Sequence, residues 1–435
     1  MTKITFSREL DVRHHVDVFV AGGGPAGAAA AVSAARQGAR VFLVEGQACL
    51  GGLGTAGLVP AFMQFTDGIH FLAGGIGEEI LNRLREYGGK DVGEAFSIKA
   101  EALKRVYDDL LLEAGVDFVF HTQLIGVEVQ DGKVSHAVLA AKSGIYAVEA
   151  KVFIDCTGDG DLAAWAGAPY EKGDEKGNMM AGTLCSLWSG IDWTKVKRPD
   201  SRALERAFDD QVFSVQDRHL PGMWKISSKS GGGNIGHTYG VDGTDEGSIT
   251  KALVYGRKLL DEYELYYKKY LTGYEDMELM ATGSLLGIRE SRRIMGDYVL
   301  NLQDFLNRSV FEDEIGRYSY PVDIHASDAS EESYAKFAKD YTTLRYGPGE
   351  SYGIPYRCLI PQKLENVLVA GRCVSTDRAM QASVRVMPGC YITGQAAGAA
   401  AALAARQGIT TRQLQVAELQ KLLKEMGAYL PNYRG

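Results

Sequence analysis

The sequence lacks any excess of basic residues. Its 47 lysines and arginines stand against 55 aspartates and glutamates, a formal net charge of −8. This balance argues against a nucleic acid or an anionic membrane as partner, because both favour a basic face. Long apolar runs are missing too: the nearest, Ala396–Ala405, is too short for a membrane span, and the first sixteen residues lack the apolar segment of a secretory signal. We therefore expect a cytoplasmic protein with no membrane and no nucleic-acid partner.

Paired cysteines are absent as well. No CxxC occurs, and the cysteines are scattered along the chain as Cys49, Cys156, Cys185, Cys358, Cys373 and Cys390. A disulfide framework or a zinc site usually shows closely spaced thiols, so neither is expected. No other cluster of metal-ligating residues stands out in the sequence, and we predict no metal.

Glycine, by contrast, is abundant, with 52 of 435 residues, which suggests tight turns and close backbone approaches to a ligand. The first glycine cluster, Gly22–Gly27, follows an apolar run at Val16–Ala21 that reads as a buried strand. An alanine-rich helix is predicted at Ala28–Gln37, and a second strand at Arg40–Val44. This order of strand, glycine turn, helix and strand is the context in which a GxGxxG motif binds a dinucleotide.

Each residue type in the turn has a physical role. Gly22 makes the turn, Gly24 lets the backbone approach a pyrophosphate, and Gly27 allows close packing of helix and strand. Pro25 and Ala26 open the helix, whose N–H groups and dipole attract phosphate. Glu45 follows the second strand and is placed to accept hydrogen bonds from the ribose hydroxyls. The sequence therefore predicts a dinucleotide-binding unit.

A second glycine-rich segment decides between a flavin and a nicotinamide. Directly after Glu45, the stretch Gly46–Gly57 reads GQACLGGLGTAG, where a nicotinamide-dependent dehydrogenase normally continues into another helix. Such a backbone can lie against a large, flat group. The candidate residues in this segment are Gly46, Gly51, Gly52, Gly54 and Thr55.

At this point the chain resembles the FAD-dependent oxidoreductase family of the glutathione-reductase-type FAD-binding fold, with fumarate reductase flavoproteins as distant relatives. The likeness rests on GGGPAG, Glu45 and LGGLGT near the N-terminus. Three further stretches match: VFIDCTGDGDLA at Val152–Ala163, GIRESRRIMGDY at Gly287–Tyr298, and the block at Ile354–Gly398 with AGR, RVMP and GQAAG. The resemblance implies FAD as the cofactor.

The same resemblance implies further FAD contacts. The TGDGD turn passes the cofactor, and the turn after a strand at Asn366–Ala370 meets its ribityl and pyrophosphate part. A break at Arg385–Gly389 precedes a helix at Tyr391–Gln407 that aims its N-terminus at the flavin, and the adenine lies near Thr122–Gly126. The implied residues are Leu124, Cys156, Thr157, Gly158, Asp161, Gly371, Arg372, Arg385, Met387, Gly389 and Gln395.

Departures from related families are informative too. The LGGLGT loop has no histidine, where covalently flavinylated relatives have one, so non-covalent FAD is expected. Cys49 has no CxxxxC partner, which argues against a thiol–disulfide relay. Gly231–Gly233 lies in a polar segment without a preceding strand, so we interpret it as a loop and not as a second dinucleotide motif.

We predict an α/β fold with a Rossmann-like FAD-binding domain of the three-layer ββα/βαβ type. Residues 1–165 form its first part and residues 350–435 its second part with C-terminal helices. An inserted α+β substrate domain covers residues 166–349. Within it, one long helix is predicted at Ser248–Leu271, with Ser248 as its cap.

The substrate domain holds the candidate catalytic residues. Arg289, Arg292 and Arg293 can anchor a substrate carboxylate, or instead form an ion-pair network that joins the domains. His237 and His325 lie in polar loops, where each is either a general base or a solvated surface residue. Tyr356, together with its neighbour Arg357, is a further candidate for the same cavity, just before the last strand of the FAD domain.

These features predict hydride transfer between a small organic substrate and the flavin, with an electron donor or acceptor that the sequence does not identify. Two alternatives remain open. The N-terminal motif could serve an NAD(P)-dependent dehydrogenase, or the FAD could be structural in a protein that binds a partner. A homodimer is the default assembly.

Overall fold

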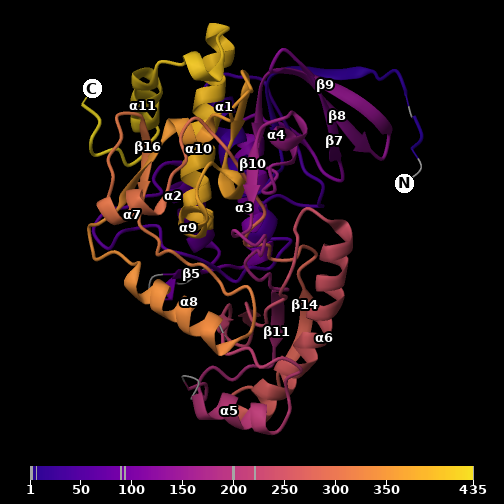
Figure 1. Cartoon of the computed structure of the whole chain (residues 1–435), viewed down its shortest axis with the longest axis vertical. Helices are drawn as coiled ribbons and strands as arrows, with labels where there is room; N and C mark the ends of the chain where they lie inside the picture. The colour runs from indigo at the N-terminus through magenta and orange to yellow at the C-terminus, as the bar shows by residue number, and fades with distance from the viewer. Residues whose placement is uncertain are drawn as a thin grey trace.

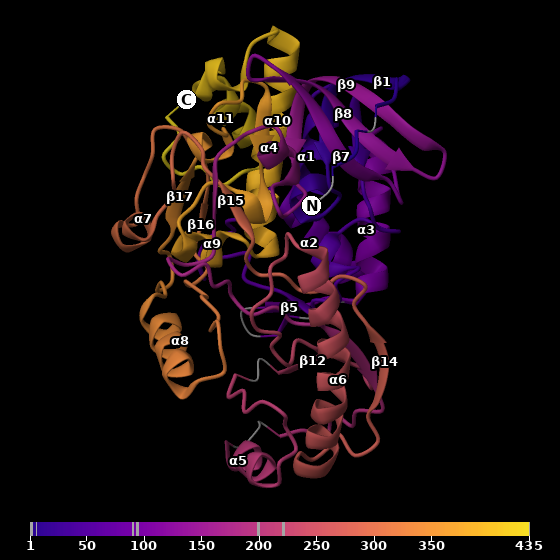
Figure 2. The same cartoon turned by 45° about the vertical axis from the view of Figure 1, so that its right-hand side comes forward.

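The computed structural model describes residues 3–5, 7–88, 91–92, 95–197, 201–219 and 222–434. Helix α6 (Glu246–Tyr270) and helix α5 (Ser201–Asp209) lie at one end of the molecule. The long strand β9 (Gly144–Asp155) and helix α11 (Val416–Glu425) lie at the other end, as Figures 1 and 2 show from two directions. No helix among the described residues is long and apolar enough to cross a membrane.

The main sheet has a parallel core with an antiparallel extension. Its order is β6-β2-β1-β9-β8-β7, and β18 pairs with β9. Strands β6, β2, β1, β9 and β18 run parallel to one another, whereas β7, β8 and β9 form an antiparallel meander. The strands are β1 (Val12–Ala21), β2 (Val41–Val44), β6 (Asp117–Val119), β7 (Gln123–Gln130), β8 (Lys133–Ala141), β9 and β18 (Val367–Val369).

Side chains along the parallel strands point alternately to the two faces of the sheet, and a hydrophobic core lies on each face. Val18 and Val20 face helices α1 (Pro25–Arg36) and α10 (Met387–Gln407), whereas Phe19 packs with the β8 side of the meander. Helices, parallel sheet and meander form the three layers that the sequence predicted, and the mixed α/β class with a Rossmann-like core is confirmed.

Helices α1 and α10 pack with almost no side chain between them. A Cβ atom at Gly394 or at Gly398 would overlap the carbonyl oxygen of Ala26 or Ala30. This contact explains the alanine and glycine content of both helices, because only small residues let two backbones come so close. The sequence placed the start of α10 at Tyr391. The helix begins at Met387 instead, because Pro388 fits its first turn and does not break it.

The inserted region has its own sheet and its own hydrophobic core, which runs from Leu184 to Ile288. Two predictions in this region are wrong. Gly231–Gly233 is strand β13, and a Cβ atom at Gly232 would lie 2.5 Å from the Cβ atom of Pro60. Helix α6 is capped by Asp245, which accepts from the Ser248 N–H, so Ser248 is already inside the helix. The antiparallel order is β12 (Met223–Lys225), β13, β11 (Ser186–Ser189) and β14 (Glu278–Thr282).

Shorter elements connect these layers, and the domain boundaries at residues 165 and 349 stay a prediction. The remaining strands are β3 (Ala61–Phe62), β4 (Asp91–Val92), β5 (Ala95–Ser97), β10 (Tyr170–Lys172), β15 (Arg292–Ile294), β16 (Glu314–Tyr318) and β17 (Tyr352–Pro355). The remaining helices are α2 (Ile76–Glu86), α3 (Ala100–Glu113), α4 (Asp161–Trp165), α7 (Leu302–Asn307), α8 (Glu331–Thr343) and α9 (Arg378–Val384).

Candidate active site

A cavity of about 390 Å³ opens where the parallel strands end. It lies beyond the carboxyl ends of β1, β2, β9 and β18, which is where open α/β sheets bind ligands. Most of the residues predicted to contact the cofactor line it. They are Gly22, Gly24, Pro25, Ala26, Glu45, Gly46, Gly52, Leu124, Cys156, Thr157, Gly158, Asp161, Gly371, Arg372, Arg385 and Met387.

Glycine stands at several positions of the first turn, each time for a different structural reason. Gly22 has φ +91°, and a Cβ atom there would lie 2.5 Å from the Cys156 carbonyl oxygen. A Cβ atom at Gly27 would overlap the carbonyl oxygen of Gly22. At Gly24, by contrast, a Cβ atom would meet no atom of the protein within 4 Å, and no side chain caps the helix that begins here. The open space at an uncapped helix N-terminus fits a pyrophosphate group.

Glu45 lies buried at the end of β2, on the wall of this cavity. Its carboxylate accepts from the Gly23 N–H and the Gln47 N–H, each at 2.8 Å. Burial raises the pKa of this carboxyl group, and the backbone donors oppose the rise. The side chain is thus fixed by the glycine turn itself, in the place predicted for a ribose contact.

Six of the predicted cofactor residues do not line the cavity. Gln395 accepts from the Ile76 N–H at 2.8 Å, and Thr55 donates to the Leu50 carbonyl oxygen. A Cβ atom at Gly389 would overlap the Val384 carbonyl oxygen. The full set is Gly27, Gly51, Gly54, Thr55, Gly389 and Gln395.

Asp155 ends β9 and is fully buried. It accepts from the Thr157 N–H, the Thr157 hydroxyl and the Ala163 N–H. Burial raises its pKa to about 6 from the ordinary value of 3.8. Because the folded chain holds this proton more tightly than the unfolded chain, the stabilisation is complete below the unfolded pKa and is lost as the pH rises through about 6.

We expect Asp155→Asn to remove this pH dependence. Between pH 4 and pH 7 the wild type should lose on the order of 2 kcal/mol more unfolding free energy than the variant. Urea unfolding across this range measures the difference. Parallel pH profiles for the two proteins would contradict the assignment.

A second cavity, of about 670 Å³, adjoins the first. Four residues line both: Leu53, Ile288, Arg385 and Met387. Met387 is the first residue of α10, and no side chain caps this helix either. The N-terminus of α10 therefore lies at the junction of the two cavities, where its dipole favours negative charge.

Arg289 is the arginine of the RESRR segment that lines the second cavity. Its side chain donates to the Ala181 carbonyl oxygen at 2.7 Å, to Thr183 at 2.9 Å and to Asn234 at 3.2 Å. The residue is 7% exposed, and burial lowers the pKa of the guanidinium to about 10, so it stays charged at neutral pH. Among the described residues no carboxylate forms an ion pair with it.

The two neighbouring arginines form ion pairs, and the catalytic role of Arg292 stays a prediction. Its guanidinium binds Asp161 at 2.6 Å and the Asp159 carbonyl oxygen at 3.0 Å, and it lines neither cavity. Arg293 binds Glu290 at 2.8 Å. Arg292 and Arg293 thus take part in ion pairs, whereas the role of Arg289 as a carboxylate anchor stays a prediction.

Tyr356 does not reach either cavity, contrary to the prediction. Its side chain is buried, and its hydroxyl donates to the Thr411 carbonyl oxygen at 2.9 Å. With Arg357 and Asp313 it borders a separate hollow that lies beside Arg412.

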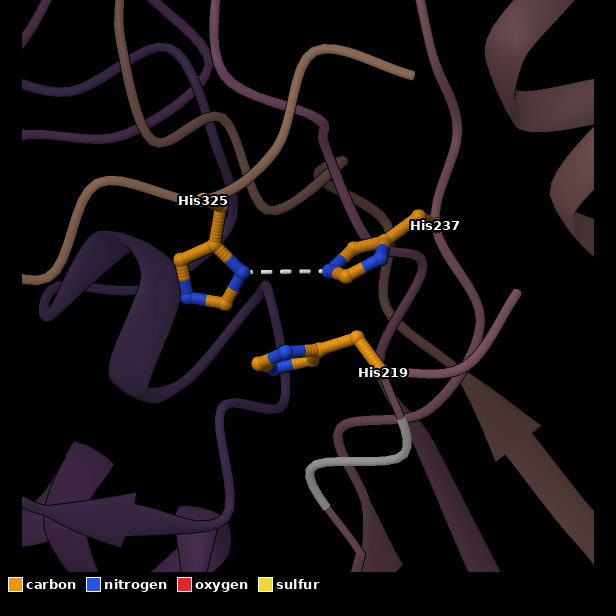
Figure 3. Close-up of side chains that lie close together, drawn as sticks. All are labelled: His219, His237 and His325. Carbon is orange, nitrogen blue, oxygen red and sulfur yellow. Dashed lines mark hydrogen bonds between the residues drawn. The ribbon is translucent and has the colours of Figure 1, made fainter. Parts of the chain in front are cut away.

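His237 and His325 lie in loops, as predicted, but neither is a surface residue. They are 2% and 6% exposed, and His237 Nε2 lies 3.1 Å from His325 Nδ1 (Figure 3). Burial lowers the pKa of both imidazoles. The third ring of this cluster is His219, which the sequence analysis did not single out. His219 and His325 line the second cavity, and His237 lies behind them.

The chain was compared with known proteins. One solved structure with a similar fold is the geranylgeranyl bacteriochlorophyll reductase-like protein of Thermoplasma acidophilum. It is 14% identical to this chain in sequence and superimposes with a TM-score of 0.50, and the match covers 95% of this chain and 84% of that one. The flavin-dependent brominase Bmp2 shares 12% with a TM-score of 0.46, over 94% and 83%. The p-nitrophenol 4-monooxygenase PnpA of Pseudomonas putida shares 13% with a TM-score of 0.43, over 95% and 87%.

No curated protein matches the sequence significantly. The family described as FAD dependent oxidoreductase matches residues 17–423, nearly the whole chain. This match supports FAD as the cofactor over the nicotinamide alternative, and the residues that line the first cavity lie within the matched range. The chain belongs to the FAD dependent oxidoreductase family.

Proposed function

We propose that this protein transfers a hydride between a small anionic organic substrate and non-covalently held FAD. The observation that carries the proposal is the placement of Arg289. It is a buried guanidinium without an ion-pair partner among the described residues, and it lines a cavity that adjoins the dinucleotide cavity. FAD supplies the hydride chemistry when bound, and the protein supplies binding, orientation and charge.

The first cavity would hold the adenosine and pyrophosphate part of FAD. Glu45 would accept from the ribose hydroxyls, and the backbone at Gly24 and Ala26 would face the pyrophosphate. The more specific likeness to glutathione-reductase-type folds, and distantly to fumarate reductase flavoproteins, stays a prediction that this turn and Glu45 support.

The N-terminus of α10 would lie at the redox end of the cofactor. The donors of this uncapped helix start at Met387, which borders both cavities. Such donors stabilise negative charge on the neighbouring group, so α10 would favour the reduced state of a bound flavin.

The second cavity would bind the substrate. Arg289 would pair with a substrate carboxylate through two parallel hydrogen bonds, which a guanidinium is shaped to form. Other parts of the cavity wall are apolar, because they are formed by aromatic side chains. These are Trp224, Tyr320, Phe337 and Tyr341. A carboxylic acid with an apolar or aromatic body fits both features.

The first test is the visible spectrum of the purified protein, before and after denaturation and filtration. A yellow chromophore that passes the filter is expected, because the flavin is held without a covalent bond. A chromophore that stays with the polypeptide would contradict non-covalent binding, and a protein that stays colourless after addition of FAD would contradict the cavity assignment.

Hydride transfer is tested next, by anaerobic mixing with a panel of hydroxy, amino and unsaturated carboxylic acids. We expect at least one carboxylate to bleach the oxidised flavin, or to re-oxidise flavin that was first reduced chemically. The corresponding amides, which lack the charge, serve as matched controls. Redox chemistry with neutral compounds alone would overturn the anionic substrate. A flavin inert to the panel in both directions would favour a structural role.

A further inference from the structure

Three histidine rings from three separate segments meet at the wall of the second cavity. His219 lies between α5 and β12, His237 follows β13, and His325 follows β16. One ring nitrogen from each lies within 4.8 Å of those of the other two. Figure 3 shows a ring nitrogen of His237 facing one of His325, with the two rings nearly perpendicular and the His219 ring beside both.

Two carboxylates lie near the outer nitrogens of this cluster. His237 Nδ1 lies 2.9 Å from Asp217 Oδ2, and His325 Nε2 lies 3.4 Å from Asp323 Oδ2. The Tyr239 hydroxyl also lies 3.3 Å from His237 Nδ1. If the two carboxylates, which can only accept, take the ring protons, the inner nitrogens His237 Nε2 and His325 Nδ1 present lone pairs to each other across 3.1 Å.

Two lone pairs at this distance repel unless a positive group lies between them. A shared proton would join His237 and His325, but it would leave His219 without a role. The ring of His219 makes no hydrogen bond among the described residues, although its centroid lies 4.9 Å and 4.8 Å from those of the other two rings. A metal ion, by contrast, would be coordinated by one ring nitrogen of each of the three histidines.

We propose that His219, His237 and His325 form a binding site for a divalent transition-metal ion. His219 and His325 also line the second cavity, so a fourth coordination position can open toward the substrate space. This pattern of three imidazoles and one open position is that of a reactive metal centre and not of a closed structural one.

The spacing of one nitrogen pair suits the ligand type, and all three nitrogens lie within 4.8 Å of one another. Imidazole nitrogens bind zinc at about 2.0–2.1 Å, so two of them in a tetrahedral site are about 3.3 Å apart, close to the 3.1 Å between His237 and His325. Imidazole favours Zn²⁺, Co²⁺, Ni²⁺ or Cu²⁺ over Mg²⁺ and Ca²⁺. Asp217 and Asp323 would orient the two rings, as carboxylates do for metal-bound histidine.

The charges around the cluster point to an anionic fourth ligand. The carboxylates of Asp217 and Asp323 are balanced by the guanidinium groups of Arg289 and Arg385, which face the same cavity. A divalent ion would therefore carry its full charge into the site. Hydroxide, or a carboxylate of the kind proposed as substrate, would offset it.

The test uses the untagged, FAD-loaded protein after treatment with a chelator. It is titrated with Zn²⁺ alone, and the metal that stays bound after gel filtration is measured by elemental analysis. We expect about one Zn²⁺ per chain. Co²⁺ should give visible absorption bands of a tetrahedral site at wavelengths beyond the flavin bands.

Variants assign the ligands. His219→Ala and His325→Ala should each weaken Zn²⁺ binding by at least about 100-fold, and Asp217→Asn by about 10- to 100-fold. His15→Ala is the matched control, because the His15 side chain is 64% exposed and distant in the sequence from the cluster. The flavin content of each variant shows whether the protein has folded, and the partly exposed His219 is the substitution least damaging to the core.

Two results would overturn the proposal. One is a wild-type protein that retains flavin but binds no stoichiometric Zn²⁺ or Co²⁺. The other is a flavin-containing His219→Ala variant that binds Zn²⁺ as tightly as the wild type. Both measurements are made without substrate, so they are separate from the test of hydride transfer.

Discussion

Gly24→Ala is expected to weaken FAD binding about 100-fold while the polypeptide still folds. The backbone at Gly24 has φ −64° and ψ −176°, which any residue adopts, and an added Cβ atom would touch no protein atom within 4 Å. The methyl group would instead occupy the space that faces the cavity at the start of α1. The methyl group should therefore weaken ligand binding without lowering the stability of the fold.

The measurement is FAD affinity by fluorescence titration of the flavin-free protein, with thermal unfolding of the flavin-free forms alongside. Flavin-free proteins must be compared, because bound FAD itself raises the melting temperature by mass action. Gly347→Ala, at an exposed turn where the nearest atom would be 3.4 Å away, is the matched control.

Gly27→Ala provides the contrast, because its Cβ atom would overlap the Gly22 carbonyl oxygen and damage the fold itself. Wild-type FAD affinity in Gly24→Ala would show that the pyrophosphate does not pass this residue. The two variants thus distinguish a glycine that makes room for the ligand, Gly24, from one that the fold itself requires, Gly27.

The turn was predictable because its determinants are local. Gly22, Gly24 and Glu45 are close in sequence, and the strand, turn and helix that position them follow from short patterns. The resemblance to a known family extended this to Cys156 and Gly371, which follow neighbouring strands of the same sheet.

The predicted cofactor residues that do not line the cavity lie within the same motifs as those that do. Gly389 and Gln395 are in α10, where the glycine permits close packing against the Val384 backbone and the glutamine satisfies the Ile76 N–H. A motif shows which segment meets the cofactor, but the direction of each side chain depends on the helix that the segment joins. The start of α10 at Met387 was itself mistaken.

The histidine cluster could not be predicted because it is built by long-range contacts. His219, His237 and His325 come from separate loops, and nothing in their spacing resembles a known metal motif. The rings of His219 and His325 pack against Phe337 of α8, and this contact depends on how the separate segments meet. The same reason explains why Arg289, and not Arg292, reaches the cavity: strand β15 begins after Arg289 and directs Arg292 toward Asp161.

Arg289→Met is expected to lower kcat/KM for the active carboxylate about 1000-fold, because it leaves the substrate charge without a partner in a buried site. Anaerobic flavin reduction at varied substrate concentration measures this. Arg289→Lys keeps the charge but not the paired geometry, so KM should rise more than kcat falls. Arg357→Met, which removes a half-exposed arginine outside both cavities, is the matched control.

Loss of Arg289 also leaves its protein acceptors, Ala181, Thr183 and Asn234, without their donor, so reduced stability alone could lower activity. The ratio of kcat/KM for the carboxylate to that for its amide separates the two causes. A stability defect lowers both values together, whereas loss of a carboxylate anchor makes the ratio collapse toward one. A flavin-containing Arg289→Met variant that keeps the wild-type ratio would show that the substrate carboxylate does not bind Arg289.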